Sequence, residues 1–433
     1  MQASDVTAAE FSQVARHAAF VRDALRQLGI RRFVLGIHSS AFPAGELDVG
    51  YGAPLSRAGD RVLALARQLG FDALQLGPSG QVSSLNLSPY DGTVFARNTW
   101  SLALGQLAQP ELGQLLPRAT LDVLAADGGG HQRVDPARAQ RLTRVALGAC
   151  QARLTQLRAA DPQQPLLADF ARFRREQAGW LELNALYEAL AVNVGDDPAR
   201  FDPAVRSLFE PGAAGLQRRA AVHVTLQAAI EQSELAQYLC HAQHAAFRER
   251  ARRAGLAVWA DMQVGFSHRD RFLHSEAFAA DWLLGAPPSR TNPHGQPWGY
   301  PLLDPDQLDQ ADSPARRLFA LRVRKLLAEH DGVRIDHPHG LVCPWIYRAS
   351  DPDPQHAVRH GARAFESPDN PEPALQRWAI AREADLDAHA HSKFADNRVG
   401  QLDATQVARY ARLFDALASA HDPALPARDV FAA

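Results

Sequence analysis

The sequence predicts an α/β fold of the (β/α)8 TIM-barrel type that carries a large helical insertion. Apolar runs of strand length follow amphipathic helical segments, which is the repeating unit of a parallel α/β sheet. One such run, Val333–His337, ends in charged side chains, and polar residues at the carboxyl ends of barrel strands are typically catalytic. The chain has 433 residues, of which 46% are hydrophobic, so it can bury the core of one large barrel or of a few smaller domains.

The N-terminal region contains two strands, each preceded by a helix. An alanine-rich helix over about Ala8–Leu28 precedes the apolar run Phe33–His38, which we expect to be the first barrel strand. A second helix over about Gly59–Leu69 precedes the second strand, Phe71–Leu76. Gly77–Gly80 then stops that strand abruptly.

A long helical segment separates these units from the third strand, which we expect within Gly255–Val264. The residues between are rich in Ala, Leu, Arg and Gln, and structureless loops of such length are uncommon in compact domains. The predicted organisation is therefore strands one and two with a substrate loop in residues 1–100, a helical insertion in 101–245, and strands three to five in 246–433.

The last part of the chain is expected to supply a binding loop and two further strands. Segment 272–306 is rich in Pro, Gly, Trp and Asn, which predicts an extended lid or binding loop rather than a helix. A helix then begins at the capping sequence Asp312–Pro314 and ends at His330. The turn at Asp331–Gly332 leads into the fourth strand, and Ala427–Ala433 has the pattern of the start of a fifth.

Arg334 and Asp336 are the strongest candidates for chemistry. They lie two residues apart in a segment that reads as a buried strand, so their side chains point to the same side. A guanidinium in this position holds a carboxylate ionised and oriented, as a carboxylate nucleophile requires. An Arg-x-Asp triplet is also typical of a structural ion pair at a strand end, but the preceding helix and turn favour the functional interpretation.

Composition gives no indication of a nucleic-acid or membrane partner. The net charge is −2, the N-terminus lacks a basic region followed by an apolar stretch, and no run of about 18 apolar residues occurs. Cys150, Cys240 and Cys343 are far apart and odd in number, which argues against a disulfide framework and a CxxC site. They indicate buried thiols in a reducing compartment, so we expect a cytoplasmic soluble protein.

Two histidine pairs have a spacing that allows two metal ligands on a strand, namely His337 with His339 and His389 with His391. Zinc normally needs three or four protein ligands, and the sequence indicates no third one. We therefore expect no metal site.

Several motifs occur in a fixed order along the chain. They are Leu76–Gly80, Ser88–Tyr90 with Phe95–Asn98 behind it, Trp180–Leu186, Gln237–Leu239, Gly285–Pro288, Gly295–Gln296, Trp298–Leu302 and Val333–His337. Together they resemble the amylomaltases, the 4-α-glucanotransferase family of glycoside hydrolases, and the resemblance extends from about Phe33 to the last residue.

This resemblance implies that an α-1,4-glucan segment is passed to the 4-hydroxyl of another glucan with retention at the anomeric carbon. Retention needs two carboxyl groups about 5 to 5.5 Å apart, one attacking C1 and the other serving as acid and then base. Asp336 matches the family's nucleophile, Arg334 the arginine that keeps it ionised, and His337 follows in the usual position. The expected partner is a maltooligosaccharide or a glycogen- or starch-type glucan, and no cofactor is needed.

The resemblance also implies sugar contacts at Tyr90 and Ser88 and, in the loop that folds over the glucan, at Trp298 and Tyr300. Pyranose rings pack well on aromatic side chains that keep a polar handle, and Tyr90 matches the residue that stacks on the sugar at the cleavage point. A loop tyrosine packed on the barrel rim is the alternative interpretation of Tyr90.

Asp261 in the third strand matches an acidic residue of the family and is a further candidate for substrate binding. The residues after it depart from the family's pattern and form a shorter loop. A structural Asp261, with His268 or Asp270 facing the sugar instead, is therefore a second interpretation. Pro338–His339 also replaces the Phe-Arg that commonly follows the nucleophile motif.

Two carboxylates of the family find no counterpart in the sequence. The acid/base glutamate lies at the end of the fifth barrel strand and the transition-state aspartate after the seventh, whereas Asp429, the last acidic residue, belongs too early. We therefore expect that the C-terminal part of the barrel is missing, that the missing segment is required, and that this polypeptide alone does not transfer glucan. The alternatives are a non-catalytic glucan-binding remnant and a hydrolase of the α-amylase class, which the motifs at 285–288 and 298–302 disfavour.

Overall fold

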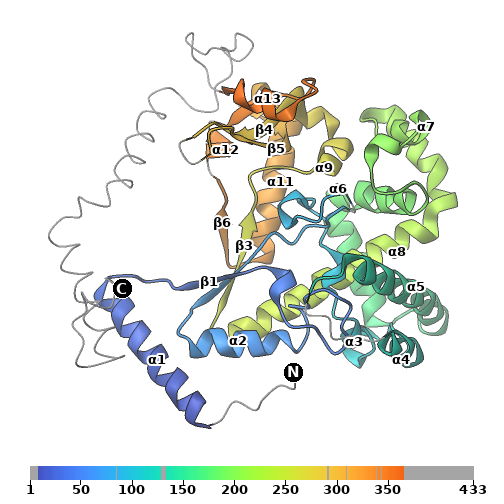
Figure 1. Cartoon of the computed structure of the whole chain (residues 1–433). Helices are drawn as coiled ribbons and strands as arrows, with labels where there is room; N and C mark the ends of the chain where they lie inside the picture. The colour runs from blue at the N-terminus through green and yellow to red at the C-terminus, as the bar shows by residue number, and fades with distance from the viewer. Residues whose placement is uncertain are drawn as a thin grey trace.

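A computed structural model describes residues 8–364, apart from 84, 128–132, 290–291, 309, 338 and 343 (Figure 1). The fifth strand expected at Ala427–Ala433, the pair His389 and His391, and Cys343 lie outside the described residues. Cys150 and Cys240 are buried free thiols. None of the helices in the described ranges is both long enough and apolar enough to cross a membrane.

Four parallel strands form the sheet that carries the candidate site. They are β1 (Val34–Ile37), β2 (Ala73–Leu76), β3 (Ala257–Met262) and β6 (Gly332–Ile335), in the order β1-β2-β3-β6. Helices α1 (Ala8–Gln27), α2 (Gly59–Gln68) and α11 (Pro314–Glu329) precede β1, β2 and β6. The mixed α/β content and the predicted strands one to four are thus confirmed, and Ser313 caps α11 as its sequence indicated.

The prediction that the fourth strand is buried was wrong. Among the described strands β6 pairs only with β3, and the side chain of Ile335 is 50% exposed. The apolar residues Val333 and Ile335 indicated a strand but not its place in the sheet. A strand at the edge of the described part of the sheet leaves some of its apolar surface uncovered.

The helical insertion lies beside the parallel sheet (Figure 1). Its α-helices are α3 (Leu104–Leu107), α4 (Arg118–Ala126), α5 (Pro136–Ala160), α6 (Pro165–Val194), α7 (Pro203–Ser207) and α8 (Gly212–Arg253). Short 3-10 helices also occur. Those that begin before the insertion are η1 (Ser39–Ala41), η2 (Pro89–Asp91) and η3 (Thr99–Ser101), and those within it are η4 (Pro110–Leu112) and η5 (Pro198–Arg200). Helix α8 continues past residue 245, so the boundary placed there falls inside one helix that leads directly to β3.

The core of the insertion explains why these helices pack together. Leu142, Cys150 and Leu154 of α5 and Leu235 and Leu239 of α8 are at most 2% exposed and belong to one apolar cluster. Burial of such side chains contributes about 1.5–3 kcal/mol each. The insertion is therefore anchored on α8, the helix that also covers β3.

A second, antiparallel sheet stands at the carboxyl ends of β3 and β6 (Figure 1). It consists of β4 (Phe278–Ala286), β5 (Gln296–Leu303), β7 (Trp345–Arg348) and β8 (Ala362–Arg363), in the order β5-β4-β7-β8. Short helices accompany it, namely α9 (His268–Leu273), η6 (Ser275–Ala277), α10 (Pro305–Leu308), α12 (His339–Val342) and α13 (Pro354–Arg359).

The segment expected to be a lid loop is therefore mostly a β-hairpin. Ala279, Leu284 and Leu302 are buried in it, and β4 pairs with β7 as well as with β5. The turn holds Pro287, Pro288 and Pro293, and Gly295 there has a φ of 69° that a residue with a side chain rarely adopts. Gly285 in β4 and Pro297, Gly299 and Pro301 in β5 lie in the strands themselves. Composition located the turn but missed the strands on both sides of it.

Candidate functional site

The centre of the site is a guanidinium that bridges two carboxylates. Arg334 on β6 donates from Nη1 to Oδ1 of Asp261 at 2.7 Å and from Nη2 to Oδ1 of Asp336, also at 2.7 Å. Parallel pairing of β3 with β6 sets Asp261 directly opposite Arg334, and Asp336 follows the end of β6 with its N–H donated to the carbonyl of Met262 at 3.0 Å. The orientation of Asp336 by Arg334, expected from their spacing, is thus present.

The two carboxylates differ in exposure. The side chain of Asp261 is 1% exposed, whereas that of Asp336 is 18% exposed and that of Arg334 is 43% exposed. Burial raises the pKa of Asp261, although Arg334 opposes this effect. Burial also disfavours the charge of Arg334, but hydrogen bonds and the charges of both aspartates raise its pKa, so it stays a cation. Asp261 is thus the buried support of Arg334, and Asp336 is the carboxylate with access to solvent.

Tyr90 lies above Asp261, from a loop that follows β2. Its hydroxyl donates to Oδ2 of Asp261 at 3.4 Å, and its ring meets the His38 imidazole edge to face at 5.8 Å. Ser88 caps the short helix η2 by accepting the N–H of Tyr90 at 3.3 Å. Ser88 therefore holds the backbone that presents Tyr90.

His38 belongs to this group but was not selected from the sequence. It directly follows β1, and a Cβ at Gly77 would come within 2.0 Å of its Nδ1, so the imidazole lies against the Gly77 backbone at the end of β2. A histidine at the carboxyl end of the first strand was the available signal.

A second aromatic group comes from β5 and the residue after Asp336. The Trp298 indole meets the His337 imidazole edge to face at 5.0 Å and lies 6.5 Å from the Tyr300 ring between centroids. The Tyr300 ring rests on Gly265, where a Cβ would come within 2.2 Å of its Cγ. His337 has a φ of 46°, a conformation that residues with a side chain adopt rarely and that is common near functional sites.

The structure argues against the alternative carboxylate. Asp270 is fully buried in a capping box with Ser267 and accepts the N–H of Val94 at 3.2 Å, so it does not face solvent. His268 is exposed at the start of α9, with Nε2 close to Gly299 of β5. Among the described residues, no group of three or more His, Cys, Asp or Glu side chains is arranged to hold a metal ion.

Comparison with known proteins connects this geometry to one family. A family model described as 4-alpha-glucanotransferase matches residues 42–415. A 4-alpha-glucanotransferase of Mycobacterium tuberculosis (strain ATCC 25618 / H37Rv) is 31% identical over 180 residues, which cover 41% of this chain and 24% of that protein. A 4-alpha-glucanotransferase of Thermus thermophilus is 29% identical over 192 residues, covering 42% of this chain and 37% of that protein.

Solved structures support the same fold. An amylomaltase from Streptococcus agalactiae in complex with acarbose superposes with a TM-score of 0.65 and 19% identity, covering 89% of this chain and 72% of that one. An amylomaltase from Corynebacterium glutamicum gives a TM-score of 0.54 at 20% identity, covering 78% of this chain and 45% of that one. The sequence matches to the Mycobacterium tuberculosis and Thermus thermophilus enzymes span about a quarter to a third of the length of those relatives. Because the family model covers most of the sequence, the chain belongs to the 4-alpha-glucanotransferase family.

Proposed function

We propose that this site binds an α-1,4-glucan and that Asp336 attacks its anomeric carbon in a retaining transfer of glucan segments. The observation that carries the proposal is the Arg334 bridge, which keeps the solvent-accessible carboxylate of Asp336 oriented beside a buried partner. A carboxylate nucleophile has to be ionised and fixed in direction before it meets C1.

Sugar binding in this proposal depends on the aromatic groups on either side of Asp336. Tyr90 stacks on the sugar at the cleavage point, and Trp298 and Tyr300 contact the glucan from β5. Ser88 and Asp261 hold Tyr90 and Arg334 in place, while His337 lies between Asp336 and Trp298. Acarbose, named in the complex of the Streptococcus agalactiae amylomaltase, suggests that maltooligosaccharides and glycogen- or starch-type glucans are the substrate class.

The second carboxylate of a retaining mechanism is not supplied by Asp261. With 1% exposure and with both oxygens occupied by Arg334 and Tyr90, Asp261 cannot protonate a leaving sugar oxygen. We therefore propose that a carboxyl group other than Asp261 serves as the general acid, since general acid catalysis contributes about 10²–10⁴-fold. The buried free thiols of Cys150 and Cys240 are compatible with a cytoplasmic location, which we also propose.

Calorimetric titration with maltoheptaose tests the binding half of the proposal. We expect heat of binding with maltoheptaose but none with cellopentaose, whose β-linkages give the chain a different shape. Tyr90→Ala should weaken binding about tenfold, because it removes one aromatic contact, whereas Tyr90→Phe keeps the ring and should retain most of the affinity.

Equal affinity of Tyr90→Ala and the unmodified protein would contradict the assignment of Tyr90.

A further inference from the structure

The loop that presents Tyr90 is held by a buried charge cluster of Arg97, Lys325 and Glu329. The loop leaves β2 at Gly77 and returns through residues 93–98, and its two arms pair with each other. Gln81 donates its N–H to the carbonyl of Ala96 at 2.8 Å, and Asn98 donates to the carbonyl of Ser79 at 2.8 Å. The returning arm therefore sets where the tip of the loop, with Tyr90, can lie.

Arg97 connects this returning arm to two helices. Its backbone exchanges two hydrogen bonds with the side-chain amide of Gln237 on α8, at 2.7 and 3.0 Å. Its guanidinium donates to Oε2 of Glu329 at 2.5 Å and to Oγ of Ser79 at 3.3 Å. Arg97 thus joins the loop, the end of β2, α8 and α11 at one point.

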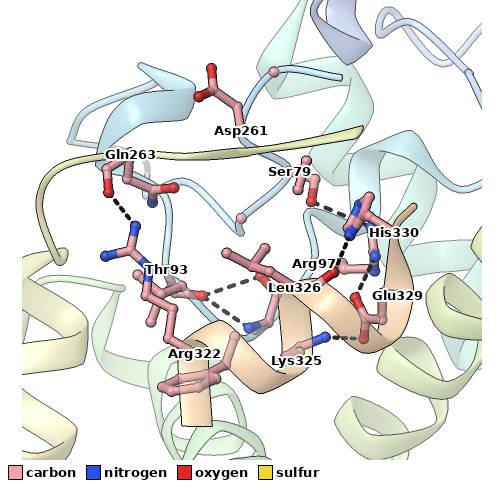
Figure 2. Close-up of a pocket in the computed structure, with 16 residues that line it drawn as sticks. Ser79, Thr93, Arg97, Asp261, Gln263, Arg322, Lys325, Leu326, Glu329 and His330 are labelled. Atoms are coloured by element: carbon pink, nitrogen blue, oxygen red, sulfur yellow. Dashed lines mark hydrogen bonds and ion pairs between the residues drawn. The ribbon is translucent and has the colours of Figure 1, made fainter. Parts of the chain in front are cut away.

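Glu329 is the last residue of α11, and β6 begins only three residues later. Its second carboxylate oxygen accepts from Lys325, and its main-chain carbonyl accepts from Nε2 of His244 at 3.0 Å. Figure 2 shows the Arg97 and Lys325 side chains reaching Glu329 from two sides, while Asp261 points away from this cluster. The side chains of Arg97 and Glu329 are 9% and 8% exposed.

The ion pair of Arg97 with Glu329 joins two elements that carry residues of the site. Buried ion pairs contribute little net stability compared with well-packed apolar residues, but they fix one arrangement of the elements that carry the charges. Here the two elements are the loop that carries Tyr90 and the helix that leads into the strand of Arg334.

We propose that Arg97 and Glu329 are positioning residues that set the Tyr90 ring relative to Asp336. They act through the backbone of residues 93–98 on one side and through the junction of α11 with β6 on the other. This inference rests on the proposed function, in which Tyr90 stacks on the sugar that Asp336 attacks.

A double-mutant cycle in the full chain tests the inference. Glu329→Gln keeps the shape of the side chain but removes its charge, and we expect it to weaken maltoheptaose binding roughly three- to tenfold. In the Tyr90→Ala background the same change should have no further effect, because the contact through which Glu329 acts is already gone. A loss of equal size in both backgrounds, or no loss in either, would overturn the inference.

The matched control is Glu234→Gln. Glu234 is also buried, with 5% side-chain exposure, and is paired with Arg174 at 2.8 Å, but its pair joins α6 to α8 and does not involve the Tyr90 loop. We expect this variant to leave maltoheptaose affinity unchanged. If Glu329→Gln fails to fold, Arg97→Lys replaces it, since lysine keeps the charge but cannot span both Ser79 and Glu329.

Amide hydrogen exchange separates this inference from the proposed function. Peptides covering residues 79–98 should exchange faster in Glu329→Gln than in the unmodified protein or in Glu234→Gln. Unchanged exchange would refute the positioning role even if glucan binds. Faster exchange in a protein that does not bind maltoheptaose would instead refute the proposed function.

Discussion

At the scale of residues, the site depends on Arg334, which holds Asp336 and is itself held by Asp261. That Arg334 and Asp336 share one side follows from the two-residue repeat of a strand, and the structure joins them at 2.7 Å. The burial of Asp261 beneath Arg334 depends on the register between β3 and β6, which a single sequence does not encode locally. Arg97 and Glu329 were missed for the same reason, because their contacts join segments that are far apart in the chain. His38 was missed although its place at the end of the first strand was a local signal.

Gly265 offers a test at this scale. An added methyl group would lie 2.2 Å from Cγ of Tyr300, so Gly265→Ala has to displace the ring. We expect unfolding free energy to fall by about 1–3 kcal/mol, as overpacking does, and maltoheptaose affinity to fall with it. Urea unfolding and calorimetric titration measure the two effects.

Gly179→Ala is the control for this substitution. Its Cβ would have its nearest neighbour at 4.0 Å, and the residue lies inside α6, so alanine should be neutral or stabilising. If Gly265→Ala behaved in the same way, Tyr300 would not be held against the Gly265 backbone.

At the scale of elements, the spacing of apolar residues and the helix-capping residues predicted where helices and parallel strands lie in the sequence. They did not predict the position of a strand within its sheet. The bounds of α1, α2 and α11 follow the expected helices closely, and β1, β2, β3 and β6 fall inside the expected runs. The hairpin of β4 and β5 was read as a loop because its turn is rich in Pro and Gly. Its first strand, β4, also pairs with β7, a segment about 60 residues further along the chain.

At the scale of the whole molecule, buried histidines make the fold sensitive to acid. Burial lowers the pKa of His274 and of His330 to about 4, and the pKa of His244 lies well below its usual value for the same reason. In the unfolded chain His274 and His330 take up protons near pH 6.5, whereas in the folded chain they do not until about pH 4. Stability is therefore complete above pH 6.5 and is lost progressively as the pH falls toward 4.

His274→Gln isolates one of these groups. The shift from 6.5 to about 4 corresponds to a loss of roughly 3 kcal/mol at pH 4, so the variant should show a shallower decline of unfolding free energy between pH 6.5 and 4. His223→Gln, at an exposed position of α8, should leave the slope unchanged. Identical slopes for His274→Gln and the unmodified protein would show that His274 does not contribute to the pH dependence.

The central claim concerns Asp336, and covalent labelling tests it most directly. Fluoride leaves without much help from a general acid, so α-maltosyl fluoride should glycosylate the nucleophile without general acid catalysis. Intact-mass measurement and peptide mapping should find one added maltosyl group, located on Asp336, and none on a folded Asp336→Asn variant. Label on another residue, or equal labelling of the folded Asp336→Asn variant, would contradict the assignment of Asp336 as the nucleophile.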